Sequence, residues 1–422
     1  MKKSILAITC VLFALCLRAQ SPDPACFPDG SAVDEWFSAE PAPLPEAEQK
    51  RFVITDYGVE PDSTILQTGQ IQKVIDLAAL EGGTVVIPQG VFLTSSLFFK
   101  PHTHLRLEKG AVLKGSDDFA DYAVAPVHIE GVIQPYIAAI INAYGVDGFT
   151  ITGEGTINGD GLRYWRGFWK RREVNRACTN LEALRPRMIY VANSSDIHIE
   201  GVSLLNSGFW NMHLYKCARV RVKDVTIWAP GPGSAVKSPS SDGIDVDGCD
   251  FVHITGCAIS NNDDQIALKG GKGPWADTDP DNACNNRILI ENCSFGPHSS
   301  AVTCGSECVG VKNMIIRGCT VNGSAQVLNL KMRKDTPQRY EYILIENVSG
   351  TAGCFLQVRP WMQFFDLKGR EDIPMSYAEH LTAKGCSVVC ARQVFNTPEA
   401  PDQYLMTDFV FTDCNLSLAE GR

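Results

Sequence analysis

The sequence lacks two features that whole classes of protein require. After its first twenty residues, the 422-residue chain contains no apolar run long enough to span a membrane. It also lacks an excess of positive charge, because 38 Lys and Arg residues are outnumbered by 48 Asp and Glu residues, for a formal net charge of -10. Binding to phosphate groups depends on Lys and Arg, so this balance argues against nucleic acid and anionic lipid as partners. An acidic substrate would have to be captured by a few cations placed within a cleft.

The first twenty residues have the pattern of an export signal. Lys2 and Lys3 precede an apolar stretch that runs from Ile5 to Leu17, and the small residue Ala19 follows it. We therefore expect residues 1–20 to be a signal peptide, residues 21–50 a polar N-terminal lead, and residues 51–422 one catalytic domain. The mature protein is then expected in the periplasm or outside the cell. Loss of Lys2, Lys3 and Arg18 changes the formal net charge from -10 to -13.

Fourteen of the 16 cysteines lie beyond the predicted signal peptide. In an exported protein they could form disulfides. Four of them instead recur in one local phrase after a short strand, which is typical of small side chains stacked inside successive turns. They are Cys257, Cys293, Cys319 and Cys386, in the phrases ITGC, IENC, IRGC and AKGC. Packed thiols are the favoured interpretation, and a disulfide framework is the alternative.

A helix is predicted over residues 68–81, ahead of a long series of strands. Thr68 is a candidate N-cap, and Gly82 and Gly83 end the pattern. The residues that share one face at helical spacing are Ile71, Val74, Ile75, Ala78 and Ala79. Short strand phrases broken by Gly and Pro follow directly. This order predicts a helix that caps the end of a solenoid.

Strand phrases with alternating aliphatic residues then repeat along the chain. From Ile199 to Ile345 their central residues are spaced by 23, 32, 36, 26 and 29 residues. A repeat of this length, built of short strands and Gly or Asn turns, predicts an all-β solenoid. A β-sandwich also contains many short strands, but it does not require the same phrase at each return. Aliphatic and polar residues alternate because one face fills the lumen and the other meets solvent.

Three aspartates are the candidate catalytic residues. Asp242 precedes Asp263 by 21 residues, which is about one coil, and stacked coils lie about 4.8 Å apart. If Ile266 and Leu268 point into the lumen, a regular strand would bury Asp264, and an unpaired buried carboxylate is costly. We therefore predict a bend at Asp263 and Asp264 that turns both side chains outward. A polar turn without a function is the alternative.

Such a cluster suits acid–base hydrolysis. Two carboxylates held side by side raise the pKa of one of them, which provides a protonated acid near neutral pH. Hydrolysis with inversion needs an acid and a base on opposite sides of the scissile bond, at a separation of roughly 6.5 to 9.5 Å.

Cation-forming side chains are predicted on the same face, on later coils. His298 follows Asp264 by 34 residues, and Lys331 follows His298 by 33. If Leu328, Leu330 and Met332 point inward, then Asn329, Lys331 and Arg333 point outward. With Lys269 they would make a site for an acidic sugar, although Arg333 fits a solvated surface charge equally well. We leave Trp165, Trp169 and Trp210 out of the site, because an isolated Trp more often closes a core or a loop.

These residues lie in phrases that resemble glycoside hydrolase family 28, the family of polygalacturonases and rhamnogalacturonan hydrolases. The resemblance covers roughly residues 50–350, and its phrases are EGGTVVIPQGVF, GEGTINGDG, RPRMIYVANSSDIHIEGV, SDGID and NDDQIALKGG, in that order. It implies a right-handed, single-stranded parallel β-helix. It also implies an inverting hydrolysis in which Asp263 is the acid, while Asp242 and Asp264 orient the water.

Two motifs depart from the family pattern. The family's Gly-His-Gly phrase corresponds to residues 297–300, and counting back from Gly305 places Ser299, rather than His298, at the histidine position. The family's Arg-Ile-Lys phrase reads Asn329-Leu330-Lys331, so its lysine is present and its arginine is absent. These departures argue against ordinary endo-cleavage of homogalacturonan and favour an exo-acting enzyme or a hydrolase of branched pectin.

The sequence therefore predicts a monomeric, inverting glycoside hydrolase that cleaves α-linked galacturonic acid bonds in a pectic oligo- or polysaccharide. No cofactor or metal is expected, since the carboxylates already serve as acid and base. The predicted substrate-binding residues are His298, Ser299, Lys269, Lys331, Arg333 and Asn329. The alternatives are a polysaccharide lyase, which removes a proton and usually needs calcium, and a non-catalytic glycan-binding β-helix.

Overall fold

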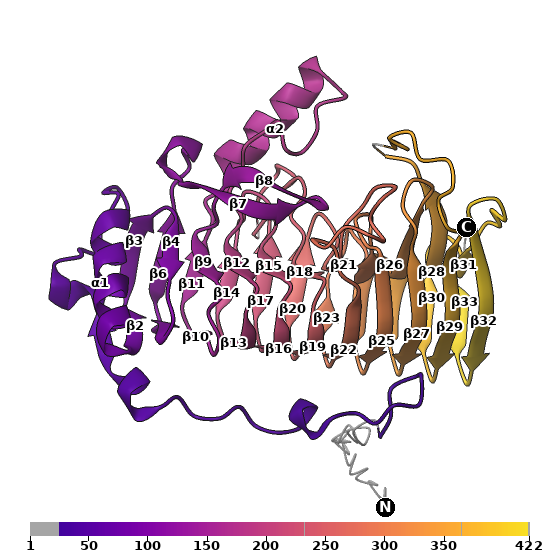
Figure 1. The fold of residues 1–422 in the computed structure, drawn as a ribbon, viewed down its shortest axis with the longest axis horizontal. Coiled ribbons are helices and arrows are strands. Elements are labelled where there is room, and N and C mark those ends of the chain that lie inside the picture. The colour runs from indigo at the N-terminus through magenta and orange to yellow at the C-terminus, as the bar shows by residue number, and fades with distance from the viewer. Residues whose placement is uncertain (1–24, 232, 364, 421–422) are drawn as a thin grey trace, which may run out of the picture.

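The computed structural model describes residues 25–231, 233–363 and 365–420. The predicted signal peptide lies outside these residues. The fold is a right-handed, single-stranded parallel β-helix, as predicted: strand after strand pairs in parallel with its counterpart in the next coil (Figure 1). Among the described residues, no helix is both long and apolar enough to cross a membrane.

One face of the β-helix is a twelve-stranded parallel sheet, in which each strand pairs with the one from the preceding coil. Its strands are β1 (Arg51–Val53), β2 (Gly83–Ile87), β5 (Thr103–Leu107), β10 (Thr150–Gly153), β13 (Ser195–Glu200), β16 (Ala218–Lys223), β19 (Asp250–Thr255), β22 (Asn285–Glu291), β25 (Gly310–Arg317), β27 (Arg339–Glu346), β29 (Ser376–Lys384) and β32 (Tyr404–Thr412).

Two further rows of parallel strands complete the coil and are joined by the long strands β26 (Thr320–Arg333) and β28 (Ser349–Trp361). The first row contains β3 (Gly90–Thr94), β6 (Ala111–Gly115), β11 (Thr156–Asn158), β14 (Ser203–Leu205), β17 (Thr226–Ala229), β20 (Ala258–Asn261), β23 (Ser294–Phe295), β30 (Ser387–Cys390) and β33 (Asn415–Leu418). The second contains β4 (Leu97–Phe99), β9 (Ile141–Tyr144), β12 (Ile189–Ala192), β15 (Met212–Tyr215), β18 (Ile244–Asp247), β21 (Ile266–Lys269), β24 (Val302–Cys304) and β31 (Phe395–Asn396). We call the second row the site sheet.

The predicted capping helix is α1 (Thr68–Glu81), at the N-terminal end of the coil (Figure 1). Its buried face contains Ile71, Val74, Ile75 and Ala78, as the periodicity indicated. Thr68 is not its N-cap, which is Gln67. The Thr68 hydroxyl instead accepts a hydrogen bond from the backbone N–H of Ser95 and so ties the helix to the coil beside it.

The lumen is filled by aliphatic side chains and thiols. The four cysteines of the repeated phrase, Cys257, Cys293, Cys319 and Cys386, are buried free thiols, as the packed-thiol interpretation predicted. Cys257, Cys293 and Cys319 lie on successive coils, each buried. Thiols fit here because they are small and apolar enough to stack at the spacing of the strands.

The N-terminal lead runs along the outside of the twelve-stranded sheet (Figure 1). It contains η1 (Glu35–Phe37) and η2 (Glu46–Gln49), and η3 (Ile54–Tyr57) follows β1. Phe27 and Phe37 of the lead pack on Leu289 and Ile315 of the sheet. The lead therefore covers an apolar patch on the outer surface of the coil.

Two insertions rise above the site sheet (Figure 1). The antiparallel strands β7 (Val124–Ile129) and β8 (Val132–Ile137), preceded by η4 (Phe119–Asp121), lie between β6 and β9 in sequence. Helix α2 (Leu162–Val174) lies between β11 and β12. Both interrupt the repeat, and both border the site described next.

Candidate active site

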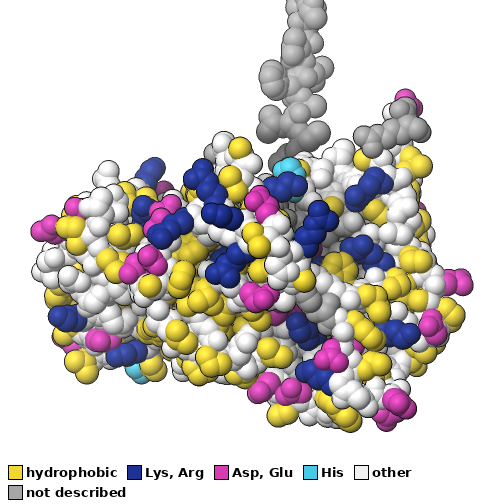
Figure 2. Space-filling view, turned by 90° about the horizontal axis from the view of Figure 1, so that it is seen from above, with side chains coloured by type: hydrophobic (Ala, Val, Ile, Leu, Met, Phe, Trp, Pro, Cys, Tyr) yellow, Lys and Arg dark blue, Asp and Glu magenta, His cyan; other side chains and the backbone are white. Residues whose placement is uncertain are grey.

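The candidate active site is a cavity of about 380 Å³ over the site sheet. Figure 2 looks onto this face, over which Lys and Arg side chains gather. The cavity has walls from α2, from the β7–β8 turn and from loops at both ends of the site-sheet strands. Its charged lining residues are Glu130, Arg172, Lys237, Asp242, Asp263, Asp264, Lys269, Glu307 and Lys331. A volume of this size suits one or two sugar units.

The fold brings the three predicted aspartates together. The backbone bends at residues 262–263, between β20 and β21, while Ile266 and Leu268 pack in the lumen. Asp263 and Asp264 both line the cavity, so the bend turns both outward, as the parity of the strand predicted. One carboxylate oxygen of each of Asp242, Asp263 and Asp264 lies within 4.8 Å of the others.

The register differs from the sequence count in one respect. Ile244 pairs with Ile266, so Asp242 lies level with Asp264 rather than with Asp263. The Gly243 N–H accordingly donates to the Asp264 carbonyl at 3.0 Å. The three aspartates also lie closer together than an inverting enzyme usually requires. One oxygen of each lies within 4.8 Å of the others, whereas the acid and base of an inverting enzyme are usually separated by roughly 6.5 to 9.5 Å.

Asp263 and Asp264 are adjacent, but their surroundings push their pKa values apart. Burial, together with the charges of Asp242 and Asp264, raises the pKa of Asp263 to about 8. Burial acts in the same direction on Asp264, yet the Lys331 ammonium, 2.6 Å from Oδ2, lowers the pKa of Asp264 overall. The Thr303 hydroxyl donates to Oδ1 of the same carboxylate at 2.8 Å. At neutral pH the pair therefore consists of a protonated Asp263 and an ionised Asp264.

Lys269 forms an ion pair with the third aspartate, Asp242. Its Nζ lies 3.0 Å from Asp242, 3.4 Å from Asp245 and 3.6 Å from Glu307. Although burial opposes the effect, these carboxylates raise the pKa of Lys269 well above its ordinary value, so Lys269 stays charged. Burial raises the pKa of Asp242, and Lys269 opposes that shift.

The other predicted binding residues are placed unequally. The Ser299 hydroxyl lies 3.5 Å from Asp264 Oδ1, whereas His298 is exposed and does not line the cavity. Asn329 and Arg333 are buried away from it. Asn329 accepts a hydrogen bond from Gln357 at 3.0 Å, and Arg333 makes two 2.7 Å hydrogen bonds to Asp335. The alternation along the strand correctly predicted that Asn329 and Arg333 point away from the lumen. Their hydrogen-bond partners, however, cover both side chains.

Sequence reasoning missed the aromatic and acidic walls of the cavity. Trp210 lies beneath Lys269, with Nζ 4.5 Å from its ring centre, and Trp361 lies 4.8 Å from Lys331 Nζ. Trp169 also lines the cavity, whereas Trp165 lies on the buried face of α2, as expected for a Trp that closes a core. Each lysine is therefore held between an aspartate and a Trp ring. The position of Trp210 could have been predicted from the sequence. It precedes the inward Met212 by two residues, just as Asp242 precedes Ile244, and Met212 pairs with Ile244.

The β7–β8 hairpin crosses the site sheet. It leaves the coil where site-sheet strands begin, yet its Gly131 turn packs on segments that follow the ends of β21 and β24. A Cβ placed on Gly131 would lie 2.8 Å from Lys272 Cγ and 3.2 Å from Glu307 Cβ. At the tip, Glu130 accepts a hydrogen bond from Asn180 Nδ2 at 2.7 Å. The hairpin turn therefore forms a wall of the cavity beside the ends of β21 and β24.

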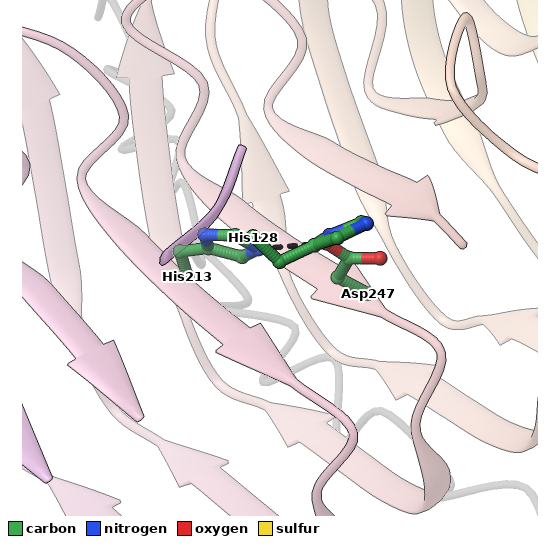
Figure 3. A group of neighbouring side chains, drawn as sticks. All are labelled: His128, His213 and Asp247. Atoms are coloured by element: carbon green, nitrogen blue, oxygen red, sulfur yellow. Dashed lines mark hydrogen bonds and ion pairs between the residues drawn. The ribbon is translucent and has the colours of Figure 1, made fainter. Parts of the chain in front are cut away.

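A buried histidine cluster holds this hairpin in place (Figure 3). His128 of β7 and His213 of β15 both bond to Asp247 Oδ2, at 2.5 and 2.9 Å. The His128 ring stacks on Tyr215, with ring centres 4.4 Å apart. We call His128, His213 and Asp247 the clasp.

The clasp has the residue types of a metal site, but its hydrogen bonds favour another role. Arg187 Nη1 lies 2.6 Å from His213 Nδ1 and donates to it, so His213 carries its proton on Nε2 and donates that proton to Asp247. A metal bound to Nε2 would leave an imidazolate beside a guanidinium donor. Burial lowers the pKa of His213 to about 3, which agrees with a neutral ring. The cluster therefore fits a structural clasp better than a metal centre.

Comparisons with known proteins agree with this geometry. The model of the family described as "Glycosyl hydrolases family 28" matches residues 82–351. A "Probable polygalacturonase" of Vitis vinifera is 30% identical over 269 residues, which are 61% of this chain and 52% of that protein. An "Exopolygalacturonase" of Zea mays is 26% identical over 295 residues, 67% of this chain and 62% of its own. The chain thus spans little more than half the length of these relatives.

A solved structure shows the same fold. The exopolygalacturonase of Thermotoga maritima aligns over 90% of both chains with a TM-score of 0.65 and 19% identity.

Proposed function

Because the chain belongs to glycosyl hydrolases family 28, we propose that it hydrolyses α-linked galacturonic acid bonds in pectic polysaccharide, by inversion and from a chain end. The protein works after export, in the periplasm or outside the cell. The observation that carries the chemistry is the pair of adjacent carboxyls with opposite pKa shifts, Asp263 raised to about 8 and Asp264 lowered.

In this mechanism Asp263 donates its proton to the leaving glycosidic oxygen. Asp264, kept ionised by Lys331 and Thr303, shares with Asp242 the task of orienting and deprotonating the attacking water. Trp210 and Trp361 present aromatic rings to the cavity, on which sugar faces can stack.

The hairpin supports attack at a chain end. An endo-acting enzyme needs a groove open at both ends, so that a polymer can continue past the scissile bond. Here the Glu130–Gly131 turn, held by the clasp, packs on the segments that follow β21 and β24 and bounds the cavity on that side. A cavity bounded in this way suits a terminal sugar better than an internal segment of the polymer.

The test is a product profile on oligogalacturonides and branched pectic fragments, with Asp263→Asn protein purified in parallel as the control. We expect new reducing ends with single sugars as the first products, and no gain in ultraviolet absorbance. An ultraviolet-absorbing product would indicate a lyase. Absence of new reducing ends from every fragment would contradict hydrolysis, and early release of long oligomers would contradict attack at a chain end.

A further inference from the structure

The two lysines that sequence analysis assigned to an acidic sugar are already paired with carboxylates. Lys331 lies 2.6 Å from Asp264, and Lys269 contacts Asp242, Asp245 and Glu307. Their ammonium groups are thus already paired with catalytic and neighbouring carboxylates. A carboxylate-bearing substrate therefore needs other cations.

The cavity offers two such cations, Arg172 on α2 and Lys237 on the loop between β17 and β18 that is bonded to α2. Within the described ranges, Arg172 and Lys237 line the cavity and have no carboxylate within 4.0 Å. The Nε of Arg172 is buried, with no hydrogen-bond acceptor among these residues. Arg172 also lines the polar cavity, where a guanidinium without a carboxylate partner suits the carboxylate of a ligand.

The wall that carries these cations is firmly built. The Trp169 indole N–H donates to the Lys237 carbonyl at 2.7 Å, which fixes the Lys237 segment to α2. Arg172 lies one helical turn after Trp169, on the same face, and its guanidinium lies 5.0 Å from the Phe168 ring. The buried guanidinium of Arg185 lies 4.4 Å from that ring, which adds a third positive charge behind the wall.

The cavity also has acidic lining residues. Glu130 and Glu307 line it, and burial with the Glu307 charge raises the pKa of Glu130. Glu307 is itself paired with Lys269 and Lys272, so the cations without a carboxylate partner, Arg172 and Lys237, are the groups that would attract a sugar carboxylate.

We propose that Arg172 and Lys237 form a carboxylate-binding subsite for a hexuronate, beside the catalytic aspartates. The subsite deepens the proposed function and rests on it for the identity of the ligand as a sugar. Arg172 comes from the α2 insertion, and Lys237 from the loop between β17 and β18.

The test measures binding rather than turnover. Galacturonic acid and its methyl ester contain no bond for the enzyme to cleave, so both can be titrated into the wild-type protein and followed by NMR. We expect the acid to bind on the order of 10-fold more tightly than the ester, as for one or two charge-assisted contacts. The Arg172→Ala/Lys237→Ala protein should lose this preference, and Arg166→Ala, on the same helix but outside the cavity, should keep it.

Equal binding of acid and ester by the wild type would overturn the proposal, as would a preference that survives in the double variant. The single variant Lys237→Met changes an exposed side chain and serves if the double variant does not fold; it should reduce the preference, and an unchanged preference would count against the subsite. If the wild type prefers the acid but hydrolyses no pectic fragment, the proposed hydrolysis fails while the subsite stands.

Discussion

Asp263→Asn is expected to abolish turnover and to stabilise the folded protein at the same time. Burial and the charges of Asp242 and Asp264 raise the pKa of Asp263 to about 8. At neutral pH the folded chain must therefore hold a proton that the unfolded chain would release. An amide carries no such cost, but it cannot donate the proton that the leaving oxygen needs.

The sign and size follow from the pKa. Because its folded value lies above its unfolded value, Asp263 makes the native protein bind more protons, and the free energy of unfolding falls as pH rises from about 4 to about 8. A change from 3.8 to about 8 sets an upper limit of about 6 kcal/mol. Asp263 is partly exposed, so solvent screening reduces the effect. We therefore expect the substitution to raise the free energy of unfolding by about 1 to 3 kcal/mol near pH 8.

The assay is thermal unfolding of both proteins across this pH range, together with initial rates. The gain in Tm should be small near pH 4, grow with pH and level off near pH 8. Asp196→Asn is a matched control with the opposite sign, because Arg219 lowers the pKa of Asp196 and the change should destabilise slightly. Wild-type rates in the folded Asp263→Asn protein, or a Tm below wild type at pH 8, would refute the reasoning.

Three further outcomes are expected. Lys331→Met should move the acidic limb of the pH–rate profile to higher pH, because Lys331 lowers the pKa of Asp264, which must be ionised; an unchanged limb would contradict that role. His128→Ala should loosen the hairpin, so that the first products become longer, whereas His102→Ala, at the exposed surface, should leave them unchanged. If both variants still release single sugars first, the clasp does not determine cleavage at the chain end. Proton NMR of the first product should show the β-anomer from an α-linked substrate, and an initial α-anomer would indicate retention.

The coil was predictable because its signals are local and repeated. Helix α1 has the predicted bounds, since amphipathic spacing and Gly82 define it without reference to the rest of the chain. The bend at Asp263 and Asp264 followed from the parity of Ile266 and Leu268, because a lumen admits aliphatic side chains and excludes an unpaired carboxylate.

Pairing between coils was less predictable, since insertions of unequal length separate equivalent strands. Counting residues placed Asp242 one coil from Asp263, whereas the register aligns it with Asp264. Parity likewise aimed Lys331 and Arg333 outward without giving their partners. Arg333 bonds to Asp335 two residues later, and Lys331 reaches Asp264 across 67 positions of sequence.

The insertions were beyond sequence reasoning. His128 and Arg172 lie in segments that match no repeat, and each reaches the site only because a hairpin or a helix folds back over the site sheet. Their function depends on contacts with Asp247 and with the cavity, and a single sequence contains no pattern for such contacts.

The short spacing of the carboxylates constrains how an inverting reaction would run here. In an in-line displacement the attacking water approaches to about 3 to 3.5 Å from the anomeric carbon, so it lies roughly 4.5 to 5 Å from the leaving oxygen. If the acid and the base both approach from one side of the line that joins the water to the leaving oxygen, their separation need not exceed roughly 4.5 to 5 Å. The three aspartates project from adjacent coils of one sheet, with oxygens within 4.8 Å of one another. Asp263 would then meet the leaving oxygen while Asp242 and Asp264 meet the water, and the β-anomer remains the expected first product.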